Sequence, residues 1–314
     1  MTNRNITAYH SKGYYGLNRT SDSRGAYAGP WRYLQAMSHT DNANNGGKAE
    51  VADGSTLAPG LRMLPSNARA DVYRLYDVLR TLDDLVDEER PHATQRVEAV
   101  ERWARNEPAD TYETRVLKDL SRRHSLPVLA FLEFCAGMRH DISHAVIRDE
   151  EELELYCQQA GGSVGIMLTH ILGSAGAECE TRMATLGRAV QRTNILRDID
   201  EDATHGRVYI AQSTIERFGA PLPGGRAELL RDQIARADEL YEQAADATSL
   251  LASGQPGMTI CAALYREILR QIERDGYGRT AGRAVVPAWR QSLLIAEYCV
   301  KPRRNSVSLA STRA

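Results

Sequence analysis

The amino-acid sequence predicts an all-α protein, for two reasons. Apolar residues recur at spacings of three and four along most of the middle of the chain, which is the period of helices with one buried face. No segment alternates apolar and polar residues between hairpin turns, as a half-exposed strand would. The 314-residue chain is 42% hydrophobic and 25% charged, which is enough apolar material for a sizeable core. We therefore expect one helical domain.

The apolar stripes place the helices along the chain. The first stripe consists of Val72, Leu75, Tyr76, Leu79 and Leu82. Later stripes predict helices over residues 93–104, 126–143, 152–173, 181–202, 226–251, 258–274 and 284–299. Helix breakers separate several of them, namely Pro91, the sequence NEP at 106–108 and the sequence GAPLPGG at 219–225.

The two ends of the chain lack this pattern. Residues 1–52 are predicted to form an N-terminal arm and a flexible connector, because residues 40–56 are polar, rich in Gly and Asn, and aperiodic. Residues 53–300 form the folded domain in this division, and residues 301–314 form a disordered tail.

The overall composition limits the classes of function. A net charge of −2 argues against bulk nucleic-acid binding. Five scattered cysteines, at positions 135, 157, 179, 261 and 299, indicate structural thiols in a reduced compartment. The N-terminal residues lack the apolar core of a signal peptide, and no run reaches the roughly 20 apolar residues of a membrane-spanning helix. We expect a soluble, cytoplasmic protein without a transmembrane anchor, for which peripheral membrane contact stays open.

Two acidic segments contradict local helix preference. The sequence LRTLDDLVDEE holds Asp83 and Asp87, which are four residues apart and therefore share a helix face. The sequence QRTNILRDIDEDATHGRVYI repeats this spacing with Asp198 and Asp202. Like charges at this spacing repel, and Asp is a poor residue inside a helix. A positive partner must compensate them if the helices are packed.

Two kinds of partner could supply this compensation. Salt bridges are the structural alternative, since Arg80, Arg90 and Arg197 lie close in sequence to the aspartates, but exposed pairs contribute only about 0.2–0.5 kcal/mol each. Mg²⁺ is the functional alternative, because it prefers oxygen ligands and takes one or two protein carboxylates together with substrate phosphates. Gln191 and Asn194 extend the face of the second aspartate pair into a polar stripe, which predicts that this helix lines a cavity. We therefore favour Mg²⁺ with a diphosphate substrate.

These segments resemble a known family. The sequences DDLVDEE and NILRDIDEDATHGRVYI are similar to the two aspartate motifs of the squalene/phytoene synthase family. The segments GMRHDI (137–142), YCQQAGGSVG (156–165), whose glycines let helices approach closely, and LYREILRQIERDGYGRTAGRAVVPAWR (264–290) resemble three further parts of it. The resemblance implies an all-α isoprenoid-synthase bundle with a central cavity, in which residues 53–300 are the catalytic domain.

The resemblance also implies roles for individual residues. Roughly two or three Mg²⁺ ions would bridge the protein to an allylic prenyl diphosphate, and their ligands would be Asp83, Asp87, Asn194, Asp198 and Asp202. The four aspartates would be catalytic together with Tyr156, which matches the family tyrosine near the reacting carbons. Asn194 would also bind substrate. The other substrate-binding residues would be Arg80, Asp141, Gln191, Arg207, Tyr277, Ser55 and Thr56.

One segment departs from the family pattern. The sequence DGSTLAPGLRMLP keeps Ser55 and Thr56, but Leu57, Ala58 and Pro59 replace an aromatic run of the head-to-head enzymes. An offshoot of the family keeps the donor chemistry and prenylates small aromatic rings of carbazole or phenazine type in secondary metabolism. We therefore favour a prenyltransferase that ionises an allylic diphosphate and forms a C–C bond to such an aromatic acceptor.

Two other hypotheses stay open. The first is head-to-head condensation of two prenyl diphosphates, which would give phytoene, squalene, dehydrosqualene or presqualene diphosphate. The second is a helical scaffold without activity that keeps the acidic helices. The sequence also leaves open whether the protein is a monomer or a homodimer.

Overall fold

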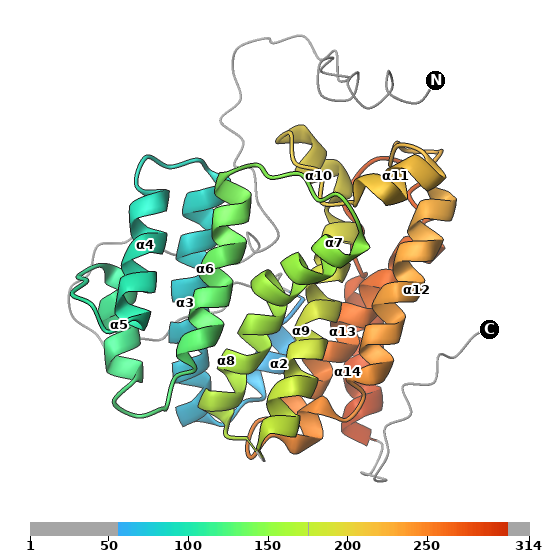
Figure 1. The fold of residues 1–314 in the computed structure, drawn as a ribbon. Helices are drawn as coiled ribbons and strands as arrows, with labels where there is room; N and C mark the ends of the chain where they lie inside the picture. The colour runs from blue at the N-terminus through green and yellow to red at the C-terminus, as the bar shows by residue number, and fades with distance from the viewer. Residues whose placement is uncertain (1–55, 175, 301–314) are drawn as a thin grey trace, which may run out of the picture.

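The structure, a computed structural model, describes residues 56–174 and 176–300. Within these ranges the chain forms helices and no strand, so the predicted all-α fold is confirmed (Figure 1). The N-terminal arm, most of the connector and the tail lie outside the described residues, and the division into these segments stays a prediction.

The helices follow one another along a single bundle. In chain order they are α2 (Ala58–Arg62), α3 (Ser66–Asp87), α4 (Ala93–Ala104), α5 (Tyr112–Leu120), α6 (Val128–Ile142), α7 (Glu150–Cys157), the π-helix η2 (Gln158–Gly162), α8 (Ser163–Leu172), α9 (Ala177–Arg197), α10 (Ile199–Thr204), α11 (Gln212–Phe218), α12 (Ala227–Gln243), the 3₁₀-helix η3 (Ala247–Leu250), α13 (Gln255–Arg274) and α14 (Ala288–Val300). Figure 1 shows α4 and α5 on one flank of the bundle, and α12 and α14 on the other.

Helix α9 lies at the centre of the bundle, where it packs against α8 and η2 and against α12 and α13. The approach of η2 to α9 requires glycine on both sides. A Cβ on Gly161 would lie 2.4 Å from the carbonyl oxygen of Gly187, and a Cβ on Gly187 would lie 2.2 Å from that of Gly161. The close helix approach predicted for the segment 156–165 is therefore confirmed. Because a Cβ on Gly161 would also lie 2.7 Å from that of Gln191, this contact helps to set the position of Gln191.

The helices differ from the predicted ones in a few places. Helix α4 has the predicted bounds 93–104, whereas no apolar stripe predicts the nine-residue helix α5. The helix predicted over 152–173 is interrupted by η2. The helix predicted over 181–202 is divided at Asp198 into α9 and α10, and the one predicted over 226–251 ends as α12 before η3.

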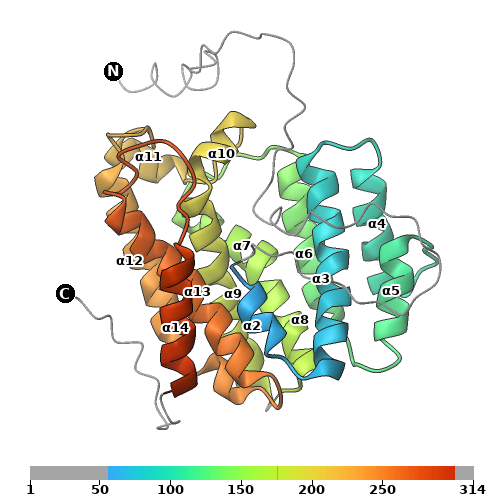
Figure 2. The same cartoon turned by 180° about the vertical axis from the view of Figure 1, so that it is seen from behind.

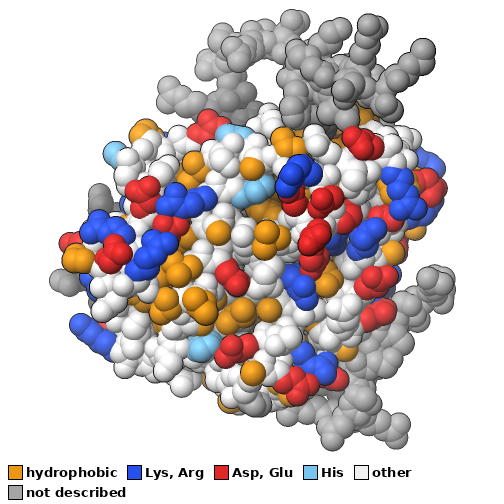
Figure 3. Space-filling view, in the orientation of Figure 1, with side chains coloured by type: hydrophobic (Ala, Val, Ile, Leu, Met, Phe, Trp, Pro, Cys, Tyr) orange, Lys and Arg blue, Asp and Glu red, His pale blue; other side chains and the backbone are white. Residues whose placement is uncertain are grey.

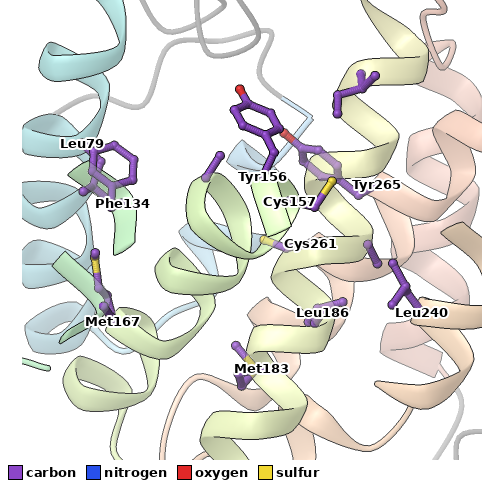
Figure 4. Packing of buried hydrophobic residues seen from close by; sticks show 14 of the residues in the cluster. Leu79, Phe134, Tyr156, Cys157, Met167, Met183, Leu186, Leu240, Cys261 and Tyr265 are labelled. Carbon is purple, nitrogen blue, oxygen red and sulfur yellow. The ribbon is translucent and has the colours of Figure 1, made fainter. Parts of the chain in front are cut away.

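Buried apolar side chains hold α3, α6 and α8 together. Figure 4 shows Leu79 and Phe134 next to each other with Met167 below them, and all three side chains are buried. Farther out, Trp103 packs edge-on against Phe131 with ring centroids 5.0 Å apart. This packing brings the C-terminal ends of α3, α6 and α9 to the same end of the bundle (Figure 1).

The surface of the bundle is mixed in charge. On the face shown in Figure 3, basic side chains are interspersed with acidic ones instead of gathering into one patch. None of the helices in residues 56–174 and 176–300 is long and apolar enough to cross a membrane. The five cysteines all lie in the described part of the chain and form no disulfide there; four of them are buried and Cys299 is exposed.

Candidate active site

A pocket lies where the ends of α3, α6 and α9 meet. It is lined by polar residues of the two acidic segments and their neighbours and by apolar residues of α6, η2 and α9. The lining residues are Asp83, Asp87, Phe134, Met138, Asp141, Tyr156, Ala160, Gln191, Asn194, Ile195, Asp202 and Tyr209. Seven of the residues predicted to form the site are thus brought together: Asp83, Asp87, Asp141, Tyr156, Gln191, Asn194 and Asp202.

Three aspartates face this pocket in a buried, strongly acidic environment. Burial raises the pKa of Asp83 well above its usual range, and the charge of Asp87 adds to the effect. Burial also raises the pKa of Asp87, although the guanidinium of Arg207 opposes this. The pKa of Asp202 is raised well above its usual range by burial and by the charge of Asp198. Such carboxylates require a cation in order to be charged together.

Oxygen atoms without hydrogen-bond partners point to the same requirement. Asp83 Oδ2, Asp87 Oδ2 and Asn194 Oδ1 are buried and have no hydrogen-bond partner, while the side-chain amide of Asn194 donates to Gln191 Oε1 at 3.5 Å. Carboxylate and amide oxygens are the ligands that Mg²⁺ prefers, so these residues fit that ion. Within the described ranges, no three acidic, His or Cys side chains form a metal site by themselves.

Asp198 lies beside the pocket and does not line it. Its carboxylate accepts hydrogen bonds from Arg197 at 2.9 and 2.7 Å and lies 3.2 Å from Nε of Arg283. The backbone leaves helical geometry here, with φ −102° and ψ 10°, and the side chain is 1% exposed. The expected continuous stripe therefore reaches the pocket through Gln191, Asn194 and Asp202 only. The role of Asp198 as a metal ligand stays a prediction.

The ion pairs offered as the structural alternative form in only one of three cases. Arg197 pairs with Asp198, as described above. Arg80 Nε donates instead to Asp84 at 3.2 Å, and Arg90 Nε donates to Glu88 at 2.7 Å. The terminal nitrogens of Arg80 are buried without hydrogen-bond partners, which leaves them available to an anion. Salt bridges to neighbouring arginines therefore do not explain the pair Asp83 and Asp87.

Arg207 links the two acidic segments. Its Nη1 forms an ion pair with Asp87 Oδ1, and its Nη2 donates to the carbonyl oxygen of Val86 at 3.2 Å. This places a half-buried cation beside Asp87, which lines the pocket. Contact of Arg207 with a diphosphate stays a prediction.

Two tyrosines hold Asp141 from opposite sides. The hydroxyl of Tyr156 donates to Asp141 Oδ2 at 3.1 Å, and that of Tyr209 donates to Asp141 Oδ1 at 2.9 Å. Their rings stack with centroids 5.0 Å apart. Burial, together with the charge of Asp141, raises the pKa of each tyrosine well above its usual value, so both keep their protons. Sequence reasoning missed Tyr209, although the quoted segment GRVYI contains it.

The remaining predicted residues lie elsewhere. Tyr277 has a φ of +55°, and its ring lies 4.4 Å below the guanidinium of Arg231. Tyr277 is not among the residues that line the pocket. Thr56 is half-buried just before α2, and Ser55 is outside the described residues.

Tyr76 and Tyr265 lie near Arg80 and Arg197 and were not assigned to the site by sequence reasoning. The guanidinium of Arg197 lies 5.9 Å from the ring of Tyr265 on α13, and the strongly raised pKa of Tyr76 is caused by burial first and then by the charge of Tyr265. Arg80 and Arg197 also act on Tyr76. Cationic side chains from α3 and α9 thus lie near aromatic side chains of α3 and α13. No local pattern predicts this group, because its members come from distant segments.

A buried helical pocket with paired aspartates and adjoining arginines defines the class of enzymes that act on prenyl diphosphates. Residues 52–290 match the family model described as Squalene/phytoene synthase. The chain belongs to this family, and it is a prenyltransferase that releases diphosphate.

Relatives and solved structures agree with this assignment. The chain is 33% identical over 256 residues to phytoene synthase of Thermus thermophilus, covering 78% of this chain and 88% of the relative. It is 30% identical over 245 residues to presqualene diphosphate synthase of Zymomonas mobilis, covering 72% and 82%. A crystal structure of a dehydrosqualene synthase in complex with ligand superposes with a TM-score of 0.71 at 24% identity, covering 79% of this chain and 91% of that chain. That structural match supports the isoprenoid-synthase bundle predicted from the sequence.

Proposed function

We propose that the chain catalyses the Mg²⁺-dependent, head-to-head condensation of two prenyl diphosphates. The observation that carries this proposal is that the relatives described above are named for head-to-head products and are matched over most of their length. The comparisons therefore favour the alternative hypothesis over the aromatic acceptor that the altered segment at residues 53–65 suggested. Drift of that segment within an ordinary head-to-head enzyme is sufficient to explain its sequence.

The pocket supports ionisation of an allylic diphosphate. Asp83, Asp87, Asn194 and Asp202 would hold Mg²⁺, which would neutralise the negative charge that develops on the departing diphosphate. In this proposal the guanidinium groups of Arg80 and Arg207 would bind diphosphate oxygens and hold the leaving group. The C1–O bond breaks and its electron pair leaves with the diphosphate.

The apolar wall of the pocket protects the allylic cation that remains. Phe134, Met138 and Ile195 line the pocket together with the acidic residues, and an apolar wall excludes water that would quench the cation. The π electrons of the second prenyl chain then form the new C–C bond at C1, and the cation left on that chain loses a proton. Tyr156, held by Asp141 at 3.1 Å, contributes a neutral, oriented ring and hydroxyl to this wall.

The experiment incubates the full chain with Mg²⁺ and either farnesyl or geranylgeranyl diphosphate, with and without a carbazole or phenazine. Extracted products and released diphosphate are both measured. We expect a condensation product of two prenyl chains in the absence of any aromatic compound. A prenylated product that forms only when the aromatic compound is present would overturn the proposal in favour of the aromatic acceptor.

A further inference from the structure

The connection between α13 and α14, residues 275–287, arches over the end of the bundle at which α10 and α11 lie (Figure 2). We call this connection the strap. It carries Arg283, whose Nε lies 3.2 Å from Asp198 Oδ1 and whose Nη1 lies 3.4 Å from Glu201 Oε2. The strap therefore supplies a cation to the second aspartate motif from a distant part of the chain.

A buried ion pair between Asp200 and Arg226 holds the strap. Nη1 and Nη2 of Arg226 donate to the two carboxylate oxygens of Asp200 at 2.6 and 2.7 Å. Asp200 Oδ2 also accepts a hydrogen bond from the backbone N–H of Gly282 at 2.8 Å. Gly282 immediately precedes Arg283, so this bond fixes the backbone from which the Arg283 side chain extends.

Arg226 contacts the strap directly as well. It is 2% exposed, and its Nη2 donates to the carbonyl oxygen of Thr280 at 3.4 Å. Gly278 has a φ of +68°, and a Cβ there would lie 2.1 Å from Nε of Arg226, so only glycine fits against this guanidinium. A buried charge that loses its partner is left uncompensated, so breaking this pair is costly and the pair anchors the strap.

We propose that Asp200 and Arg226 are positioning residues that hold Arg283 against Asp198, and that the anchored strap makes Mg²⁺ binding at Asp198 depend on a diphosphate. The inference rests on the proposed function, because that function supplies the diphosphate. With the strap anchored, Asp198 is neutralised by Arg197 and Arg283, so Mg²⁺ alone must displace a cation to reach it. A diphosphate carries more charge than one carboxylate and can accept two parallel hydrogen bonds from a guanidinium group. It therefore draws Arg283 away from Asp198 and leaves Arg197 as the one remaining cation among the two described above.

The test measures Mg²⁺ binding to the full chain through the shift in Tm, with and without inorganic pyrophosphate, so the readout does not depend on turnover. Asp200→Asn keeps the size of the side chain and removes its charge. Glu101→Gln is the matched control, because Glu101 accepts from Arg139 at 2.6 and 2.7 Å in a similar bidentate pair that does not involve the strap. Both variants should have a lower Tm without ligand.

Of these two variants, only Asp200→Asn should change the affinity for Mg²⁺. Without pyrophosphate, we expect the Mg²⁺ concentration that gives half of the maximal Tm shift to fall by about fivefold or more in this variant. Adding pyrophosphate should then change that concentration less than it does in the parent chain. Arg283→Gln breaks the same contact with the anchor intact and should have the same effect, which keeps the test available if Asp200→Asn does not fold.

The outcomes separate this inference from the proposed function. If the folded strap variants bind Mg²⁺ like the parent chain and the control, with and without pyrophosphate, the anchor is merely structural and the inference is overturned. If the parent chain binds Mg²⁺ and pyrophosphate as expected but condenses no prenyl diphosphates, the proposed function fails and the coupling through the strap stands.

Discussion

The Asp83→Asn variant should be more stable than the parent chain and should lose prenyl transfer. Burial, and then the charges of Asp87 and Asp141, raise the pKa of Asp83 well above its usual value of 3.8. A carboxyl group with a raised pKa in the folded state contributes stability below its unfolded pKa, and this stability is lost as the pH rises through the folded pKa. Ionisation of Asp83 as the pH rises therefore destabilises the folded chain when no metal is bound.

The size of the effect follows from the surroundings of the side chain. Asp83 is 8% exposed and its Oδ2 has no hydrogen-bond partner. A buried polar group without a partner costs about 1–3 kcal/mol, and asparagine keeps the shape without the charge. We expect the variant to gain about 1–2 kcal/mol at alkaline pH, which corresponds to a rise in Tm of roughly 2–8 °C for a domain of this size. Loss of a metal ligand should lower kcat about a hundredfold or more.

The assay measures Tm without Mg²⁺ and the rate of diphosphate release with it. Asp71→Asn is the control on the same helix, because Asp71 Oδ1 accepts from Arg123 at 2.7 Å and its Oδ2 lies 2.8 Å from Nε2 of His124. This control should lose stability and keep its turnover. A lower Tm in Asp83→Asn, or a turnover within about threefold of the parent, would refute the reasoning.

Three further outcomes are expected. The difference in Tm between Asp83→Asn and the parent should be small near pH 4 and should grow toward about pH 8; a constant difference would contradict the raised pKa of Asp83. Tyr209→Phe removes the donor to Asp141 Oδ1 and should lower kcat about tenfold at a stability cost of about 1 kcal/mol, as measured by steady-state kinetics and denaturant unfolding; unchanged kinetics would remove Tyr209 from the site. Gly161→Ala would place a Cβ 2.4 Å from the carbonyl oxygen of Gly187 and should cost about 1–3 kcal/mol or more in thermal unfolding, so an unaltered Tm would disprove the close contact of η2 and α9.

The periodicity of the sequence locates the long helices because each of them buries one face in the bundle. Helices α3, α4 and α13 follow the apolar stripes closely. The periodicity does not predict the short helices α5 and α11. Their nine and seven residues form too few turns to show a period. At the start of α5, Thr111 and Thr114 cap each other, and this pair differs from the Ser/Thr and Glu/Gln pattern that marks many helix starts.

The candidate site is predictable where it depends on local spacing. Asp83 and Asp87 share a helix face, and Gln191, Asn194 and Asp202 reach the same pocket. The position of Asp198 depends on Arg283, which comes from the strap, and no local pattern contains that contact. Tyr209 lies in the loop after α10, where no period marks it, and only its place after the aspartate motif could have suggested it.

The crowding of four acids between residues 198 and 202 is explained by their separate partners. Asp198 pairs with Arg197 and Arg283, Asp200 pairs with Arg226, and Glu201 pairs with Arg283, whereas Asp202 lines the pocket. Like charges this close would destabilise α10 on its own, so this helix depends on guanidinium groups from α9, from the strap and from the start of α12. Three of the acids are thereby occupied. Asp202 is the acid of this segment that can meet a metal before any rearrangement, and it is also the one whose pKa is raised well above its usual range by burial and by Asp198.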